Sequence, residues 1–361
     1  MPATSDPDPR PALSARSFVF GDDRPFASCH ASTLLPLADG RIMVAWFGGS
    51  HERHADVAIW AATRNPGGQW SAPTVLADEA GLPHWNPVLA RSPSGRLVLF
   101  YKVGPDCMRW RTRVLASREV GATWSKPVEL PALDGFPPGP VKNKPIALAD
   151  GSWLAPTSRE TPTAWDAAVT RSRDDGESWE LAGPVPLDHA EFEGKGVIQP
   201  ALWESAPGIV HMLLRSSAGR IYRSDSADSG RSWSAASPTE LPNNNSGIDL
   251  ACVPDGGAAG GADVLALCHN PVPASWGKRT PLVVSLSADN GLSWEDPIVL
   301  EDEDLPEDEE QIRLTKAYRP TEFSYPAIVA DGTTLRITYT WKRARICYRE
   351  ITVPGPGTGQ R

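Results

Sequence analysis

Short apolar runs separated by turn residues recur along most of the chain. Each repeat has an apolar stretch, a turn that contains Gly together with Asp, Ser or Pro, and a second apolar stretch. Apolar runs of about five residues between such turns are typical of antiparallel β-strands joined by short loops. Six of these strand pairs are recognisable, at residues 32–47, 87–102, 145–156, 200–215, 250–268 and 326–341.

A second repeated motif ends in tryptophan and follows the first five strand pairs. In its full form it reads Ser-x-Asp-x-Gly-x-Ser-Trp, where the Asp accepts hydrogen bonds from nearby backbone N–H groups and the Gly supplies a positive φ. This is turn chemistry, so we expect these boxes to build the fold and to carry no catalysis. The copies are Ser172–Trp179, Ser226–Trp233, Ser287–Trp294, the variant Ser117–Trp124 with Glu119 for Asp, and the reduced copy Thr63–Trp70.

The tryptophans that close the boxes are 54, 55, 54 and 61 residues apart. Repeats of this length with about four strands each predict the blades of a propeller, here an all-β, six-bladed β-propeller over residues 17–350. The last repeat has no complete box, so the segment 17–23 is expected to add a strand that closes the ring. Residues 1–16, rich in Pro and acids, are expected to form a disordered leader and residues 351–361 a flexible tail.

The charge balance narrows the possible partners. The 361-residue chain has 35 Lys and Arg against 44 Asp and Glu, a formal net charge of −9. This balance offers no broad cationic surface for a phosphate backbone, so no nucleic-acid partner is expected. No apolar stretch approaches the ~18 residues that cross a bilayer, so no membrane partner is expected either. The acidic run 301–310 is expected to be a solvated surface loop.

The five cysteines form no Cys-x-x-Cys pair, and their odd number suits a reducing compartment. The N-terminal segment also lacks the hydrophobic core of a signal peptide. We therefore expect free thiols and a cytoplasmic protein. His51 and His54 do not have the spacing of the His-Glu-x-x-His zinc helix, so no bound metal is expected.

In a propeller the first strand of each blade lines the central channel, so polar residues far apart in sequence meet at one mouth. Equivalent positions that serve packing alone should hold similar residues. The residues at the equivalent positions of this chain differ in chemistry, which favours a functional site over a structural lining of the channel. The strand-start set is His30, Asn86, Lys144, Gln199, Asp249 and Tyr325, and the set at the ends of the second strands includes Glu52, Lys102, Arg159, Glu160, Arg215, His269, Asn270, Lys342 and Arg343.

The boxes, the six repeats and phrases such as DGRIMVAWFGG, WNPVL, GPVKNKPI and NSGID resemble the sialidase superfamily, in its BNR-repeat branch of sialidase-like proteins. The resemblance covers about residues 25–348. It implies a propeller that acts on the glycoside of an acidic sugar and needs no metal or organic cofactor.

By this resemblance, three arginines hold the carboxylate of the sugar, because a guanidinium forms paired hydrogen bonds to a carboxylate. Arg215 matches the middle arginine of the family and Arg279 matches the third. His30 stands where the first arginine is found, and Arg53 or Lys102 could substitute for it.

The resemblance also implies a tyrosine nucleophile, a glutamate that takes its proton and an acid/base aspartate. Tyr325 matches the nucleophile, and Asp56, with Glu52 close by, matches the acid/base, although it could also simply cap its loop. The glutamate position holds Gln199, whose amide cannot act as a base. The base would then be Glu193, Glu322 or Glu160.

These residues also have structural interpretations. Tyr325 could be a core aromatic with its hydroxyl bonded to backbone. Arg215 and Arg279 could pair with channel acids such as Asp249. His30 could be a satisfied structural histidine or a general base near neutral pH.

We therefore expect a sialidase-like exo-glycosidase that releases a terminal acidic sugar, sialic acid or a related ulosonic acid, from glycans. One alternative is a lyase or hydrolase on uronate-containing glycans, with His30 or Tyr325 as base. Another is a non-catalytic carbohydrate-binding propeller. The expected catalytic residues are Tyr325, Asp56, Glu52 and His30, and the expected substrate-binding residues are Arg215, Arg279, Lys144, Gln199, Asn86, Lys102 and Asp249.

Overall fold

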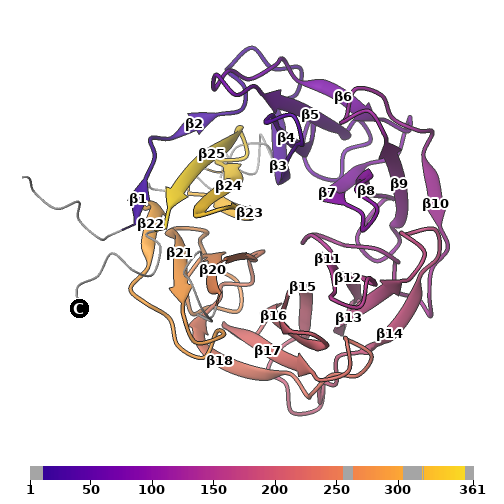
Figure 1. Cartoon of the computed structure of the whole chain (residues 1–361), viewed down its shortest axis with the longest axis vertical. Helices are drawn as coiled ribbons and strands as arrows, with labels where there is room; N and C mark the ends of the chain where they lie inside the picture. Colours follow the sequence, from indigo (N-terminus) through magenta and orange to yellow (C-terminus); the bar gives the residue numbers. More distant parts are fainter. Residues whose placement is uncertain (1–10, 255–262, 304–318, 320, 354–361) are drawn as a thin grey trace, which may run out of the picture.

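The computed structural model describes residues 11–254, 263–303, 319 and 321–353. These residues form strands and turns, and they contain no helix, so none that is long and apolar enough to span a membrane. Their strands make six antiparallel sheets that stand around a central axis (Figure 1). The expected all-β, six-bladed β-propeller is confirmed.

Each of the first five blades is a four-stranded meander whose first strand lies nearest the axis. From the axis outward, the strands are β3 (Ser28–Pro36), β4 (Ile42–Gly49), β5 (Ala58–Arg64) and β6 (Thr74–Ala77) in blade 1; β7 (His84–Arg91), β8 (Leu97–Val103), β9 (Arg111–Ser117) and β10 (Val128–Leu130) in blade 2; β11 (Ile146–Ala147), β12 (Trp153–Glu160), β13 (Trp165–Ser172) and β14 (Glu180–Pro184) in blade 3; β15 (Val197–Ala206), β16 (Ile209–Ser216), β17 (Arg220–Ser226) and β18 (Ser237–Pro242) in blade 4; and β19 (Asp249–Val253), β20 (Val264–His269), β21 (Leu282–Ser287) and β22 (Ile298–Glu301) in blade 5.

The sixth blade is built from both ends of the described chain. Two short N-terminal strands pair antiparallel with its third strand and form its outer edge. The expected closing strand within residues 17–23 is therefore confirmed, and the ring has no open sheet edge at this seam. The strands of this blade are β23 (Phe323–Asp331), β24 (Thr334–Trp341), β25 (Arg345–Thr352), β1 (Ala12–Leu13) and β2 (Ser17–Phe18).

Strand pairing contradicts three local expectations. Ala12 and Leu13, expected in a disordered leader, form β1 and pair with β25; residues 1–10 lie outside the described residues. Ile351 and Thr352, expected in a flexible tail, belong to β25; residues 354–361 lie outside the described residues. Glu301, expected in a solvated loop, is buried at the end of β22 and accepts a hydrogen bond from Tyr339, whereas 304–310 lie outside the described residues.

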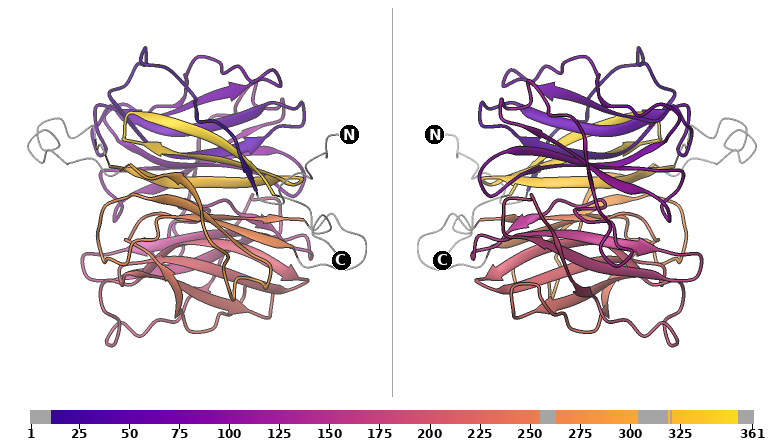
Figure 2. Two further views of the ribbon diagram at one scale, coloured as in Figure 1. Left: turned by 90° about the vertical axis from the view of Figure 1, so that its left-hand side faces the viewer. Right: turned by 90° about the vertical axis from the view of Figure 1, so that its right-hand side faces the viewer.

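Apolar cores lie between the blades. Every pair of neighbouring blades shares one cluster of buried apolar side chains among the described residues. Between blades 2 and 3, for example, Trp153 packs with Val88 and Phe100. Figure 2 shows the ring from the side, with the first and last blades next to each other. All five cysteines are among the described residues and none forms a disulfide, so the expected free thiols are confirmed.

The tryptophan boxes form the turns between the third and fourth strands of the blades. In the box of blade 4, Asp228 accepts hydrogen bonds from the backbone N–H groups of Arg231 and Ser232 at 3.0 and 2.9 Å and from the Ser232 hydroxyl at 2.6 Å. Trp233 Nε1 donates to the Gly230 carbonyl oxygen at 3.1 Å. The boxes are fold elements, as expected.

Asp228→Ala tests how much one box contributes. Losing these hydrogen bonds should lower the free energy of unfolding by about 1–2 kcal/mol at pH 7. Burial opposes ionisation of Asp228, but hydrogen bonds from Ser232 and Ser226 outweigh it and lower its pKa to about 2, against an ordinary 3.8. The stabilisation is therefore present above about pH 4 and disappears as the pH falls through 2.

Urea unfolding of both proteins between pH 7 and pH 2 measures this difference. The gap between wild type and variant should narrow at low pH. Asp23→Ala, at an exposed aspartate, is the matched control and should leave stability unchanged. Equal stability of Asp228→Ala and wild type at pH 7 would show that the box contributes nothing.

Candidate active site

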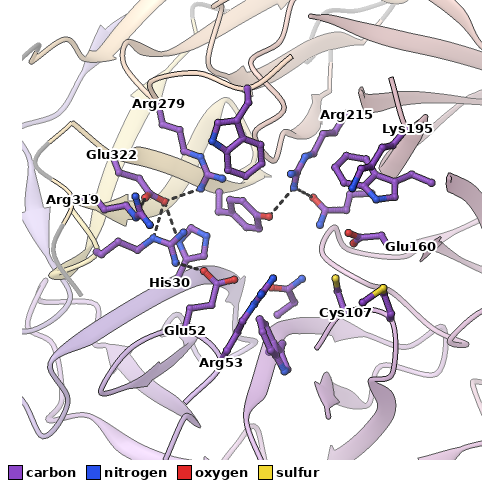
Figure 3. Close-up of a pocket in the computed structure, with 18 of the residues that line it drawn as sticks. His30, Glu52, Arg53, Cys107, Glu160, Lys195, Arg215, Arg279, Arg319 and Glu322 are labelled. Carbon is purple, nitrogen blue, oxygen red and sulfur yellow. Dashed lines mark hydrogen bonds and ion pairs between the residues drawn. The ribbon is translucent and has the colours of Figure 1, made fainter. Parts of the chain in front are cut away.

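A cavity of about 990 Å³ opens where the inner strands begin, and all six blades contribute to its wall (Figure 3). Of the described residues in this wall, seven are Lys or Arg and three are Glu. The wall is thus positive although the whole chain carries a formal charge of −9. Concentrated charge of one sign in a cleft attracts ligands of the opposite sign, so the cavity suits an anion.

Four inner strands share an unusual backbone shape where they enter the cavity. Register shifts interrupt the pairing of β3, β7, β15 and β23 with their neighbours. Positive φ is uncommon for residues other than glycine, and β-bulges redirect side chains. The bulge residues are Ala31 (φ 53°), Asn86 (40°), Gln199 (54°) and Tyr325 (51°), and the last three line the cavity.

This pattern corrects one assignment. The sequence repeat predicts that His30 and Tyr325 occupy equivalent positions at the starts of their inner strands. In the structure the bulge residue of blade 1 is Ala31, one position after His30. His30 therefore corresponds to Ser324 in blade 6. It still lines the cavity, because the neighbouring blade holds its ring in place.

Tyr325 lies between two guanidinium groups. Arg215 Nη1 donates a hydrogen bond to Tyr325 Oη at 2.7 Å. Arg279 Cζ lies 5.3 Å from the centre of the phenol ring, within the range of a cation–π contact. The structure thus brings together the tyrosine and the two arginines that the sialidase resemblance implied.

Arg215 is buried with neutral partners. It is 4% exposed, and its Nε donates to Asn245 Oδ1 at 2.9 Å while Nη1 donates to Gln199 Oε1 at 3.1 Å as well as to Tyr325. Among the described residues, no carboxylate forms an ion pair with it. The alternative that Arg215 pairs with a channel acid such as Asp249 is therefore wrong, whereas Arg279 does pair with a cavity acid, Glu322. A buried charge without a counter-ion is costly, so an anionic ligand would complete the site around Arg215.

Glu322 is the counter-ion of the other arginines. Its Oε1 accepts hydrogen bonds from Arg279 Nη1 at 2.7 Å and from Arg343 Nε at 2.8 Å. Burial opposes ionisation of Glu322, but Arg343 and Arg279 outweigh it and hold its pKa well below the usual value. Arg343 Nη1 also donates to Glu52 Oε2 at 2.7 Å. Glu52, expected to be catalytic, thus lines the cavity as an ion-pair partner.

His30 is neutral at pH 7. The residue is 2% exposed, Nδ1 lies 2.8 Å from Thr340 Oγ1, and the ring centre is 4.2 Å from that of Tyr325. Burial and the nearby Arg343 hold the pKa of His30 well below its usual value. A neutral imidazole does not replace the charge of the missing family arginine, but it can accept a proton.

Glu160 supplies a carboxyl to the opposite side of the cavity. It ends β12 and lies beside Cys107, across from Glu322 (Figure 3). Burial raises the pKa of Glu160, although Arg215 and a hydrogen bond with Cys107 oppose the shift. Of the three glutamates considered as bases, Glu160 and Glu322 line the cavity and Glu193 does not.

Three expected binding residues do not line the cavity. Lys102 is fully buried, donates to Thr112 Oγ1 at 2.7 Å, and burial lowers its pKa well below the usual value. Lys144 Nζ forms an ion pair with Asp249 at 3.0 Å, and Asp249 also accepts the backbone N–H of Ile328 at 2.9 Å. The contacts of Lys144 and Asp249 join different blades, whereas the Lys102–Thr112 contact lies within blade 2.

Asp56 is also outside the cavity wall. Its side chain is 46% exposed, and its Oδ1 accepts the backbone N–H of Ser50 at 2.9 Å and lies 2.7 Å from His54 Nδ1. Burial opposes ionisation of Asp56, but the hydrogen bonds from Ser50 and His54 together outweigh it and lower the pKa of Asp56. Its place outside the cavity wall and its lowered pKa both disfavour Asp56 as the proton donor.

Sequence reasoning did not assign a role to several residues of the wall. Arg343 lies in the turn after β24. The sequence predicted it only as one of the polar residues at the ends of the second strands. Lys195, Trp110 and Trp276 come from loops, where the repeat gives no register, whereas Trp85 lies in β7 and Trp165 begins β13. The tryptophans offer flat apolar faces of the kind that pack on sugar rings; they are Trp85, Trp110, Trp165 and Trp276.

Within the residues that the structure describes, no three His, Cys, Asp or Glu side chains are grouped so that they could hold a metal ion. The cavity wall offers a phenol, imidazoles, carboxyls and guanidinium groups.

Comparison with known structures supports the propeller. The Hadza microbial sialidase Hz136 superposes with a TM-score of 0.70 at 17% identity, over 90% of this chain and 65% of that chain. A protein of unknown function from Dyadobacter fermentans gives 0.73 at 14% identity, over 96% and 100%. A leech intramolecular trans-sialidase gives 0.70 at 13% identity, over 96% and 71%. Identities this low show the fold alone.

Sequence comparison adds the family. No curated protein matches the chain. The family model described as BNR repeat-like domain matches residues 40–337, well over half of the chain. The chain therefore belongs to the BNR repeat-like family and has the propeller fold of the sialidase-like proteins.

Proposed function

We propose that the protein is a glycosidase that releases a terminal acidic sugar from glycans. The observation that carries this proposal is the buried guanidinium of Arg215, whose partners are all neutral and include the phenol of Tyr325. A carboxylate on the substrate would supply the missing negative charge, and a guanidinium can bind it through two parallel hydrogen bonds. The sialidases among the structural neighbours support a glycan as the partner in general.

Arg215 and Arg279 are the proposed carboxylate-binding pair. Each has an indole nearby: Arg215 Cζ lies 5.8 Å from the ring centre of Trp165, and Arg279 Cζ lies 5.7 Å from that of Trp276. Trp276 is 70% exposed. Aromatic faces beside cations can pack on the apolar face of a sugar while its carboxylate is held.

Tyr325 is the proposed nucleophile and His30 the proposed acceptor of its proton. The phenol oxygen would bond to the anomeric carbon, and the phenolic proton would pass to the neutral imidazole that packs on the ring. Bound carboxylate would offset the positive field of the arginines, which raises the basicity of His30 at the moment it is needed. This assignment replaces the family glutamate, which is Gln199 here.

Elimination on a uronate-containing glycan is the second candidate, favoured by Gln199. An amide holds a substrate but removes no proton, so the base would be the oxygen of Tyr325, to which Arg215 Nη1 donates a hydrogen bond at 2.7 Å. The phenolic proton would first pass to His30. Tyr325 would then take the proton beside the carboxylate. A carbon–carbon double bond would form as the neighbouring carbon–oxygen bond breaks, with its electron pair leaving on oxygen.

We also propose a cytoplasmic location. The absence of any disulfide among the five cysteines is in keeping with a reducing compartment. Fractionation of cells that express the protein, followed by immunoblotting, checks the location.

Tyr325→Phe tests the nucleophile. The variant keeps the ring and loses the oxygen, so release of 4-methylumbelliferone from the α-sialoside should fall by at least about 100-fold. Tyr222→Phe is the matched control, because Tyr222 lies in β17 and does not line the cavity. It should retain wild-type activity, and both variants should melt at the wild-type temperature.

The products distinguish the candidates. Methylumbelliferone release supports the glycosidase, and a product with the absorbance of an unsaturated uronate supports elimination. A wild-type protein that binds acidic sugars but converts none across a panel of sialosides and uronosides would be a carbohydrate-binding propeller. Full activity of Tyr325→Phe would exclude the tyrosine from either reaction.

Arg215→Lys tests the carboxylate contact. The change keeps the positive charge but removes the planar fork, so kcat/KM for the α-sialoside should fall by about 10–100-fold, mainly through KM. Arg223→Lys, in the ion pair with Asp225 away from the cavity, should change kcat/KM less than about twofold. Equal kinetics for the two variants would contradict the proposed role of Arg215.

A further inference from the structure

A smaller pocket of about 160 Å³ adjoins the main cavity on the side of blades 2 and 3. The two spaces share part of their walls. The side chains that line both are Cys107, Met108, Trp110 and Glu160. A ligand with two parts can therefore occupy the cavity and this side pocket together.

The side pocket suits an uncharged ligand. Its arginines are already paired, Arg159 Nη2 with Asp166 at 2.8 Å and Arg111 Nη1 with Glu129 at 3.0 Å. Ser158 is 2% exposed, and its hydroxyl has no hydrogen-bond partner among the described residues. An unpaired buried hydroxyl is costly, so a ligand hydroxyl would satisfy it. The main cavity differs, because it has an excess of positive charge.

Glu160 stands at the junction of the two spaces. The groups around its carboxyl are the thiol of Cys107 and the cations Arg53, Lys195 and Arg215. None of these cations forms an ion pair with it among the described residues. Burial raises the pKa of Glu160, which favours the protonated form that a proton donor needs.

Building on the proposed glycosidase function, we propose that the side pocket binds the neutral sugar that leaves, and that Glu160 donates a proton to the oxygen joining the two sugars. The acidic sugar lies in the main cavity against Arg215 and Tyr325. Its anomeric carbon lies near both spaces, so the bond to be cleaved spans their shared wall.

The reaction balances in two steps. As the anomeric carbon bonds to the Tyr325 oxygen, the carbon–oxygen bond to the leaving sugar breaks, its electron pair stays on that oxygen, and the oxygen takes the Glu160 proton. The phenolic proton goes to His30. Water then bonds to the anomeric carbon and gives a proton to Glu160, while Tyr325 leaves and recovers its proton from His30.

Glu160→Gln with two substrates of different leaving group tests the proton donor. 3′-Sialyllactose has a basic sugar oxygen that must be protonated, whereas methylumbelliferone leaves readily without help. The variant should lose at least about 100-fold in kcat/KM on sialyllactose and less than about tenfold on the methylumbelliferyl α-sialoside. The basic limb of the pH profile for sialyllactose should disappear as well, because that limb reports the loss of the Glu160 proton.

Ala132→Trp tests the side pocket independently of catalysis. Ala132 is exposed and lines only this pocket, so the indole should fill it without disturbing the fold. KM for sialyllactose should rise by about tenfold, whereas inhibition by the 2-deoxy-2,3-dehydro derivative of sialic acid, which has no leaving sugar, should stay unchanged. Ala72→Trp, at an exposed position away from both spaces, is the matched control and should change neither value.

Two results would overturn this proposal while leaving the glycosidase standing. One is an equal loss on both substrates, or no loss, in Glu160→Gln that melts like wild type. The other is an unchanged KM for sialyllactose in Ala132→Trp. If wild type cleaves neither substrate, the proposed glycosidase itself fails and the leaving-sugar site fails with it.

Discussion

Glu52 and Arg343 lie 291 positions apart in the chain, and their side chains meet at 2.7 Å because the propeller is a closed ring. The N-terminal strands β1 and β2 form the outer edge of the blade that ends the fold, so the first and last blades cannot separate without losing strand pairing. The ring holds six inner strands at the same axis. Bulges at the starts of four of these strands then turn side chains from distant repeats into one cavity.

The same cavity shows how a protein of net negative charge can hold a concentrated positive site. Glu322 neutralises part of that charge, since one of its oxygens accepts hydrogen bonds from Arg279 and Arg343. Glu52 pairs with Arg343 on its other side. Arg215 receives no such counter-ion among the described residues. The positive charge left unpaired is therefore focused beside Tyr325, where an anionic ligand gains most from it.

The fold was predictable from sequence because each repeat carries its own turn chemistry and apolar strands, and four-stranded units of this length have few ways to pack. Tyr325 and Gln199 were predictable as residues at strand starts. The bulge at Ala31 was not predictable, because a bulge changes which residue of the strand points into the cavity and leaves the repeat pattern intact. The sequence identified Glu160 only as one of three candidate bases. Its raised pKa depends on burial by other blades, which the repeat pattern does not show.

Gln199 connects these observations. A glutamate at this position would lie within hydrogen-bond reach of Arg215, as the amide oxygen does at 3.1 Å. It would neutralise that guanidinium and weaken its attraction for a carboxylate ligand. The glutamine keeps the hydrogen bond and leaves the charge free. Anion binding is thereby strengthened at the expense of a base beside Tyr325. The proposed reaction therefore assigns proton transfer to other groups in the wall. His30 is placed for the proton of Tyr325 because its imidazole packs on the phenol ring with 4.2 Å between the ring centres, although burial and Arg343 lower its pKa. Burial raises the pKa of Glu160, which favours the protonated carboxyl that a proton donor needs.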